Sequence, residues 1–273
     1  MPELPDLEVI KEFLQGVLPA QRIEAAEVLR PLVVRTLFLG DFTATLQHNQ
    51  VSRVRRRGKF LLFDLQSGHV IVINPMLAGQ IHYCATDERR RAKTFVILHL
   101  SEDMDLRYVD PRSMGKIYLT LDEGLVPGFA RQGPDALDPE LTVELFRERL
   151  QGRRGEIKGL LTNQTMLAGI GNAYADEILF NAGIYPFRKR PSLSPDEVER
   201  LYLSVRSVLS SAIAILRERV SEDIGVKIRD FLSVHGKGGS PCPRCGTAIS
   251  EITARGRLTN FCRTCQPGRM IGG

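Results

Sequence analysis

The sequence predicts a mixed α+β protein, in which a strand-rich N-terminal half precedes a helical region and a small cysteine-containing C-terminal segment. Short β-rich runs recur from about residue 22 to 121, an apolar stripe at helical spacing follows Ser194, and two Cys-x2-Cys pairs stand near the C-terminus. A chain of 273 residues is long enough for one large or two modest domains.

The N-terminal half begins with a predicted helix, because apolar residues recur at helical spacing from Leu7 to Leu18 and Pro5 suits a first turn. The strand-like runs that follow are residues 51–55, 60–63, 70–73, 95–98 and 117–119. Many short strands at regular spacing favour either a sandwich or a barrel. Cys84 lies among them, and we expect a buried or half-buried strand residue there rather than a nucleophile.

A change of pattern separates this region from the rest of the chain. Residues 126–139 contain three prolines and two glycines, a composition typical of a linker. Ser194-Pro195-Asp196-Glu197 then has the residues of a capping box, and an apolar stripe runs from Val198 to Val220. We therefore expect a long helix that begins near Pro195.

The segment Gln164–Asn172 predicts a tight connection between two helices. Gly169 and Gly171 supply permissive backbone, and Asn172 is expected to cap the second helix. Such a turn presents backbone N–H groups and a helix N-terminus to an anion. The alternative is a turn with no binding role.

Four of the five cysteines form the pairs Cys242-x2-Cys245 and Cys262-x2-Cys265. This spacing suits one structural Zn²⁺ in a tetrahedral four-sulfur site, with a short β-hairpin between the pairs. The alternative is two disulfides, which an intracellular setting disfavours. Residues 1–6 lack the basic and apolar regions of a secretory signal, so we expect a cytoplasmic, bacterial nucleoid-associated protein.

The charge distribution favours a polyanionic partner. The chain carries 37 Lys and Arg against 32 Asp and Glu, a net charge of +5. Basic residues gather at 53–59, at 89–93 and in the cysteine-containing segment, and phosphate binding needs such local excess. Solvated surface charge is the alternative for any single cluster. No apolar run is long enough to span a bilayer.

Three motifs occur together and in order: Pro2-Glu3-Leu4-Pro5, the loop Ala168–Asn172 and the four-cysteine segment. This combination closely resembles the formamidopyrimidine-DNA glycosylase/endonuclease VIII family of DNA repair enzymes. The resemblance implies a catalytic β-sandwich with flanking helices over residues 1–130, a helix–two-turn–helix domain over 131–235 and a zinc finger over 236–273. It also implies a monomer whose partner is double-stranded DNA containing damaged bases. No membrane is expected as a partner.

Base-excision lyases need an uncharged amine nucleophile, and an α-amino group, with a pKa of about 8 against about 10.4 for Lys, supplies one at neutral pH. The resemblance assigns this role to Pro2, which becomes an N-terminal secondary amine once Met1 is removed. Glu3 is the candidate general acid toward the opening deoxyribose. If Met1 stays attached, Pro2 is an amide and the mechanism is impossible.

The resemblance also assigns phosphate contacts near the lesion to Lys59, Lys158, Asn172 and Arg257, and Arg suits bidentate phosphate contacts. An enzyme that reacts at the sugar must extrude the nucleotide from the duplex and fill the gap.

The residues that the resemblance implies for filling the gap are Met76, Arg112 and Met114. Three positions depart from the family pattern. Residues 73–76 read Ile-Asn-Pro-Met where His-Leu-x-Met is common, Met114 stands where a Phe is usual, and Asn163 stands where an acid is usual.

The segment 232–241 is shorter than in typical members that process 8-oxoguanine, where a longer insertion folds over the flipped purine. Formamidopyrimidines, oxidised guanines and oxidised pyrimidines are therefore comparable expected substrates. The alternatives are an endonuclease VIII-like preference for oxidised pyrimidines and a catalytically silent damage-binding protein.

Overall fold

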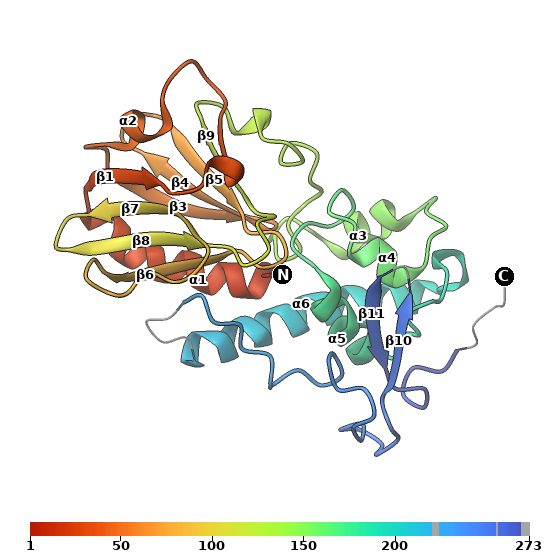
Figure 1. The fold of residues 1–273 in the computed structure, drawn as a ribbon. Coiled ribbons are helices and arrows are strands. Elements are labelled where there is room, and N and C mark those ends of the chain that lie inside the picture. Colours follow the sequence, from red (N-terminus) through yellow and green to blue (C-terminus); the bar gives the residue numbers. More distant parts are fainter. Residues whose placement is uncertain (220–223, 255, 269–273) are drawn as a thin grey trace. The chain divides into compact units, whose positions relative to one another are not determined.

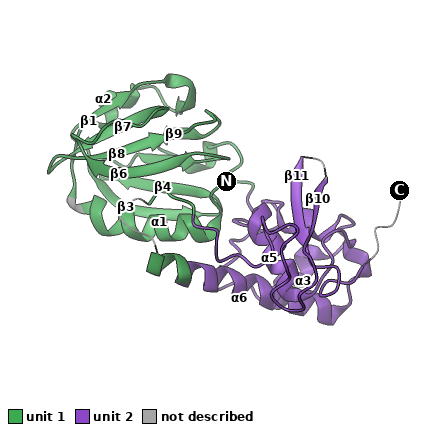
Figure 2. Cartoon of the chain, turned by 60° about the horizontal axis from the view of Figure 1, so that its bottom comes forward, with its two compact units in different colours: residues 1–131, 215–227 green, residues 132–214, 228–273 purple. Residues whose placement is uncertain are grey.

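The computed structural model describes residues 1–219, 224–254 and 256–268, and these residues form two compact units (Figures 1 and 2). Unit 1 comprises residues 1–131 and the described residues of 215–227. Unit 2 comprises residues 132–214 and the described residues from 228 onward. The predicted α+β class is confirmed, with the two larger sheets in unit 1 and most of the helices in unit 2 (Figure 1).

Unit 1 begins with the predicted helix, α1 (Leu4–Val17), whose buried face includes Leu7, Ile10 and Leu14. Its short helical segments are η1 (Leu18–Ala20), η2 (Pro31–Val33), α2 (Phe42–Leu46) and η3 (Glu123–Leu125). Two of them, η2 and α2, connect successive strands.

Nine strands form two separate sheets among the residues of unit 1 that the structure describes. The five-stranded sheet has the order β2 (Val34–Thr36), β9 (Lys116–Thr120), β5 (Val70–Asn74), β4 (Phe60–Leu65) and β3 (Val51–Arg57). The four-stranded sheet has the order β1 (Ile23–Val28), β7 (Thr94–Leu100), β8 (Met104–Val109) and β6 (Gln80–Ala85). All neighbouring strands are antiparallel except β2 and β9.

The main core lies between the two sheets, where Phe63 and Ile71 of one sheet share a buried cluster with Phe95 and Leu98 of the other. This packing identifies the strand region as a sandwich rather than a barrel. Cys84 lies on β6 and is 5% exposed, which confirms the expected buried strand position.

A second cluster lies on the five-stranded sheet and accounts for part of the predicted linker. Val126 and Phe129 are buried against Phe60, Leu62 and Tyr118. The first residues of the predicted linker are therefore packed on unit 1 rather than exposed, because their apolar side chains cover apolar positions of β4 and β9.

Unit 2 contains α3 (Val143–Leu150), α4 (Ile157–Leu161), α5 (Asn172–Ala182), η4 (Arg190–Ser192) and most of α6 (Pro195–Arg219). The capping box of α6 is confirmed, since the N–H of Glu197 donates to the Ser194 hydroxyl and the N–H of Ser194 donates to the Glu197 carboxylate. Val220, the last predicted position of the apolar stripe, lies outside the described residues. No helix in the described ranges is both long enough and apolar enough to cross a membrane.

The prediction that Asn172 caps α5 is wrong. The N-cap is Gly171, and Asn172 is the first helical residue. The side chain of Asn172 is used elsewhere, because its amide donates to the backbone oxygen of Leu258 in the hairpin formed by β10 (Ser250–Ala254) and β11 (Arg257–Phe261).

Candidate nucleic-acid interface and zinc finger

The N-terminus of the chain lies at the start of α1, against an apolar pocket. Pro2 is buried, and Glu3, which is 3% exposed, occupies the N-cap. The backbone N–H of Glu3 donates to the carboxylate of Asp6 over 2.8 Å, which fixes the first turn of the helix. Pro2, Asp6 and Ile10 line the pocket together with residues 224–227. The structure therefore holds Pro2 and Glu3 in a defined position beside a space with apolar walls.

Lys59 lies in the tight turn that joins β3 to β4. Gly58 has φ +56°, a conformation that glycine adopts without strain, and Lys59 is 8% exposed. Leu61, two residues further along β4, lines the same pocket as Pro2. Lys59 therefore stands at the start of a strand that helps to form this pocket.

Residues 75–79, called the Met76 loop here, join β5 to β6. Met76 has φ +49°, which non-glycine residues rarely adopt, and its N–H donates to the Asn74 side chain over 3.1 Å. Pro75 and Gly79 of this loop also line the pocket beside Pro2. The sheet thus holds Met76 in a strained conformation at an edge of that pocket.

Residues 110–115, called the Arg112 loop here, join β8 to β9. The carboxylate of Asp110 is fully buried and accepts backbone hydrogen bonds of 2.7–3.0 Å from Arg112, Met114 and Gly115. The side chains of Arg112 and Met114 are exposed, the latter at 41%. One buried carboxylate thus orders a loop that presents two of the predicted DNA-binding side chains to solvent.

In unit 2, three predicted site residues meet at β11. Lys158 Nζ donates to the backbone oxygen of Leu258 over 2.8 Å, and the Asn172 amide donates to the same oxygen over 2.6 Å. Arg257, the preceding residue, is exposed and donates to the Thr162 hydroxyl over 3.3 Å. The structure therefore brings together Lys158, Asn172 and Arg257, which the sequence separates by up to about a hundred positions.

Lys158, a predicted phosphate contact, is mostly buried within unit 2. It is 7% exposed, and its ammonium pairs with Asp176 Oδ1 at 2.6 Å and donates to the Thr259 hydroxyl at 2.8 Å. A buried ammonium with these partners fixes the position of β11 relative to α4 and α5. Arg257, in contrast, extends from the hairpin into solvent.

Two neighbouring acids of α5, which the sequence reasoning did not single out, organise this region. The Glu177 carboxylate accepts hydrogen bonds of 2.8 Å from the backbone N–H groups of residues 233–235. Asp176 Oδ2 accepts from the His235 ring at 2.7 Å and from the Asn260 N–H at 3.2 Å. Two adjacent acids within an otherwise apolar helix were the available sequence signal, since such groups are buried only when they are paired.

Replacing Asp176 with alanine is expected to destabilise unit 2 by about 3 kcal/mol or more, because the buried Lys158 ammonium loses its counter-charge. Denaturant unfolding of the full chain measures this change. Glu199→Ala, which removes an exposed acid of α6, is the matched control and should change stability by less than about 0.5 kcal/mol. Equal stability of both variants would contradict this role of Asp176.

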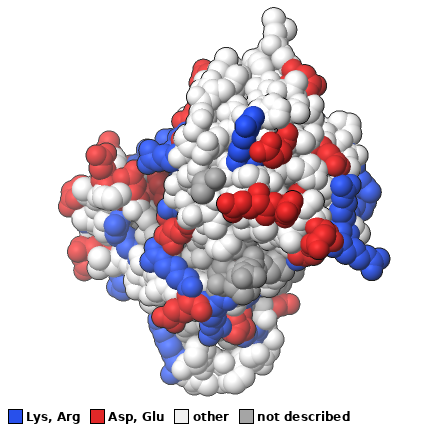
Figure 3. Space-filling model, turned by 90° about the vertical axis from the view of Figure 1, so that its left-hand side faces the viewer, with Lys and Arg blue, Asp and Glu red and all other residues white. Residues whose placement is uncertain are grey.

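The basic cluster at residues 53–59 is partly neutralised within the protein. Arg55 pairs with Asp64 at 2.6 Å, and Arg56 pairs with Glu8 at 2.5 Å. The hydrogen bond to Asp64 raises the pKa of Arg55 above its ordinary value. Figure 3 likewise shows acidic and basic side chains interspersed on the face in view. Local sequence charge therefore overstates the phosphate-binding capacity of this segment.

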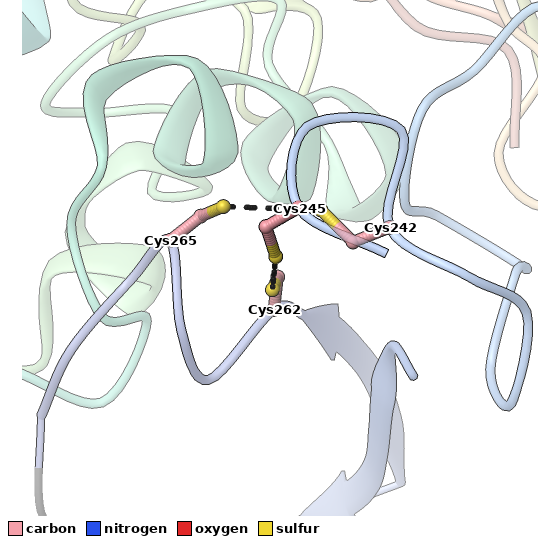
Figure 4. A group of neighbouring side chains, drawn as sticks. All are labelled: Cys242, Cys245, Cys262 and Cys265. Atoms are coloured by element: carbon pink, nitrogen blue, oxygen red, sulfur yellow. Dashed lines mark hydrogen bonds between the residues drawn. The ribbon is translucent and has the colours of Figure 1, made fainter. Parts of the chain in front are cut away.

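The four cysteines of the predicted metal site lie together at the base of the β10–β11 hairpin (Figure 4). Their Sγ atoms lie within 4.8 Å of one another, with Cys242 and Cys265 at 3.9 Å and Cys245 and Cys262 at 3.5 Å. Four Zn–S bonds of about 2.3 Å separate sulfurs by about 3.8 Å in a tetrahedron. A disulfide needs an S–S distance of about 2.05 Å, so these distances support the zinc interpretation over two disulfides.

The pKa values of the clustered thiols shift in different directions. The hydrogen bond with the Thr247 hydroxyl lowers the pKa of Cys245 to about 6, which favours the thiolate that binds metal. Burial, followed by the neighbouring cysteines, raises the pKa of Cys265 to about 12. A divalent cation at the centre offsets this penalty, because it stabilises each thiolate.

Comparisons with known families cover most of the chain. Residues 1–117 match the model of the formamidopyrimidine-DNA glycosylase N-terminal domain, residues 132–223 match the H2TH domain of that glycosylase, and residues 239–268 match a zinc finger found in FPG and IleRS. The zinc-finger match and the sulfur geometry agree on a site for one structural zinc ion.

Curated relatives match over nearly their full length. A formamidopyrimidine-DNA glycosylase of Pelotomaculum thermopropionicum is 36% identical, over 97% of this chain and 99% of that protein. One of Symbiobacterium thermophilum is 38% identical, over 98% of this chain and 90% of that protein.

Solved structures of Lactococcus lactis Fpg share the fold. The complex with DNA containing an abasic site has a TM-score of 0.87 and 29% identity, covering 97% of this chain and all of that one. The complex with DNA containing an oxidised pyrimidine has a TM-score of 0.89 and 30% identity, covering 98% of this chain and all of that one.

Proposed function

Because the chain belongs to the formamidopyrimidine-DNA glycosylase family, we propose that it excises oxidised bases from duplex DNA and then cleaves the strand at the abasic site. The observation that carries this proposal is the Pro2-Glu3 pair, buried at the N-terminus of α1 beside an apolar pocket. The names of the relatives and the DNA in the complexes of the Lactococcus protein support the same substrate class.

In the proposed reaction, removal of Met1 frees the secondary amine of Pro2. Its nitrogen lone pair attacks the sugar C1′, the bond between C1′ and the damaged base breaks, and the base leaves with the bonding electron pair. The nitrogen then loses its proton, and the departing base takes up a proton. Opening of the deoxyribose then leaves an iminium ion between Pro2 and C1′. This cation acidifies the adjacent sugar carbon, so loss of a proton there expels the 3′ phosphate and cleaves the strand.

Glu3 and Lys59 assist this chemistry in the proposal. Glu3, adjacent to the nucleophile, protonates the ring oxygen of the deoxyribose as the sugar opens. Lys59, at the start of β4, stabilises the phosphate next to the lesion. The apolar pocket beside Pro2 offers a low-dielectric space in which charge that develops on the reacting sugar interacts more strongly than in water.

The remaining predicted residues divide into two groups in the proposal. Met76, Arg112 and Met114 fill the gap left by the extruded nucleotide, and the strained and pinned loops that carry them suit this role. Arg257 grips phosphates near the lesion, with Asn172 beside it. Lys158 acts through β11, whose position it fixes, and so supports Arg257 indirectly.

The preferred lesion is the finer part of the proposal. The Lactococcus protein appears in complexes with abasic-site, oxidised-pyrimidine and formamidopyrimidine DNA. The short segment 232–241 offers few residues to cover a large flipped purine. This weakens the case for 8-oxoguanine in particular. Because the curated relatives are named formamidopyrimidine-DNA glycosylases, we propose formamidopyrimidines and further oxidised guanines as leading substrates, with oxidised pyrimidines as the alternative.

Borohydride trapping on a panel of duplexes tests nucleophile and lesion together. Each duplex carries an abasic site, a formamidopyrimidine, 8-oxoguanine or an oxidised pyrimidine. A covalent adduct with the abasic duplex supports the lyase chemistry, and the order of single-turnover rates gives the lesion preference. DNA binding without adduct or incision on any duplex would establish the silent damage-binding alternative instead.

Arg257→Ala is expected to weaken binding to all duplexes by a similar factor and to reduce the salt dependence by about one phosphate contact. The reason is that the exposed Arg257 guanidinium on the hairpin is proposed to contact backbone phosphates, which are the same in every duplex, and not the edges of the bases. Binding titrations at several salt concentrations measure this slope. Arg263→Ala removes another arginine of the finger as a control, and a lesion-selective loss in Arg257→Ala would contradict a phosphate contact.

A further inference from the structure

We propose that Tyr108 is a positioning residue that locks the Met76 loop and the Arg112 loop together, so that their side chains enter the duplex as one unit. This inference rests on the proposed function, because it concerns how the gap left by the extruded nucleotide is filled. Tyr108 is on β8, next to the Arg112 loop in sequence, and is 3% exposed.

The Tyr108 hydroxyl lies between the two loops. A Cβ atom built at Gly115, in the Arg112 loop, would stand 1.7 Å from the hydroxyl oxygen. A Cβ atom built at Gly79, in the Met76 loop, would stand 2.2 Å from the same oxygen. Only glycine lets the backbone of both loops approach the hydroxyl this closely, so the phenol acts as a spacer between them.

The backbone of the loops also meets at this point. The Cβ position of Gly115 lies 3.2 Å from the backbone oxygen of Asn74, and that of Gly79 lies 2.6 Å from the backbone oxygen of Pro75. Asn74 pairs with Lys116 where β5 meets β9. The Met76 loop follows β5 and the Arg112 loop precedes β9, and these two strands are neighbours in the five-stranded sheet. Tyr108 belongs to β8 of the four-stranded sheet, and its hydroxyl lies between the two loops.

Both loops are held by fixed backbone conformations and hydrogen bonds, so a movement of Tyr108 at their base would move the whole loop. Met76 and Ser113 have φ values of +49° and +57°, which their surroundings must impose. Gly79 donates to Pro75 across the Met76 loop at 2.8 Å, and Asp110 holds the N–H groups of the Arg112 loop. A shift at the base of either loop therefore moves Met76 relative to Arg112 and Met114.

The Tyr108 hydroxyl satisfies no hydrogen-bonding group of the described residues. It is buried, and no hydrogen bond joins it to any residue that the structure describes. Burial, with a smaller effect of Asp110, raises the pKa of Tyr108 well above its ordinary value, so the group stays neutral. Burying a hydroxyl without a hydrogen bond lowers the stability of the folded state. The hydroxyl therefore does not serve stability, and we infer that it serves to hold the two loops apart at a fixed distance.

The test compares Tyr108→Phe with wild type and with Tyr118→Phe, a similarly buried tyrosine of β9 that packs in the other cluster. Each protein reacts with the same abasic site in duplex DNA and in single-stranded DNA, where no gap has to be filled. Insertion is followed separately by the fluorescence of a base analogue opposite the lesion. Thermal unfolding reports stability.

For Tyr108→Phe we expect a loss of about tenfold in single-turnover incision of duplex, with a reduced fluorescence change. Single-stranded trapping should stay within about twofold of wild type, because the chemistry is untouched. The melting temperature should stay the same or rise, since the substitution removes a buried hydroxyl that has no hydrogen bond to a described residue. Gly115→Ala, which displaces the hydroxyl, should lose more incision of duplex and should also melt at a lower temperature, because the added methyl overlaps a buried oxygen.

Equal incision of duplex by wild type and Tyr108→Phe would overturn the inference. Equal losses on duplex and single-stranded DNA would overturn it as well, because the defect would then lie in the chemistry or the fold. Failure of the wild type to form any adduct would contradict the proposed function instead, so the two failures are distinguishable.

Discussion

Pro2→Gly is expected to reduce the borohydride-trapped adduct on abasic duplex by at least about a hundredfold, while duplex binding stays near the wild-type level. The pyrrolidine ring fixes the amine on a rigid and buried N-terminus, whereas glycine leaves a primary amine on a freely rotating backbone. Binding is retained because the phosphate contacts come from other residues.

Intact mass accompanies this experiment, because only chains that have lost Met1 can react. In a preparation where part of the wild-type protein keeps Met1, the adduct should contain processed chains alone. Pro31→Gly is the matched control, since Pro31 is an exposed proline of the same unit that starts η2. An adduct on chains that keep Met1, or a full adduct in Pro2→Gly, would refute Pro2 as the nucleophile.

The features that could be predicted from the sequence are those set by neighbouring residues. The Ser194–Glu197 capping box, the helix after Pro5 and the cysteine spacing each depend on side chains only a few positions apart. The strand runs were also recognisable from β-branched residues. Their division into two sheets was not, because the parallel pairing of β2 with β9 joins segments about eighty residues apart.

The candidate site shows the same limit. The sequence marks Lys158 as a cation, but its partner Asp176 and the backbone oxygen of Leu258 become neighbours only in the folded chain. Arg55 and Arg56 contribute to a basic cluster in the sequence, yet Asp64 and α1 neutralise much of it. Charge and residue type can be read locally, whereas exposure depends on long-range packing.

Asp110 makes contacts within a few residues that its sequence surroundings do not single out, whereas Tyr108 makes a contact that no local pattern contains. Asp110 precedes a proline and suggests an ordinary turn, but its carboxylate orders an entire loop. The contact of Tyr108 with Gly79 exists because the pairing of β6 with β8 brings the Met76 loop and the Arg112 loop together. Such contacts follow from topology, so they could be found only after the two sheets were known.

Removal of zinc is expected to unfold the finger and to weaken duplex binding by at least about a hundredfold, since Arg257 depends on the hairpin and the hairpin depends on the cysteine cluster. A structural zinc site contributes about 10 kcal/mol or more to the folding of so small a segment. Loss of the hairpin also removes Leu258 and Thr259 from Lys158, which leaves that buried ammonium with fewer partners.

Cys262→Ala is the corresponding variant, because Cys262 is fully buried in the cluster. Metal analysis should give one zinc per wild-type chain and a large loss of zinc in the variant. Cys84→Ala, which removes a buried cysteine of β6 outside this cluster, should keep both its zinc and its affinity for DNA. Because the finger lies in unit 2 and Pro2 lies in unit 1, trapping of single-stranded abasic DNA by Cys262→Ala should fall much less than duplex binding. Undiminished duplex binding by a zinc-free chain would show that the finger does not carry the phosphate contacts assigned to it.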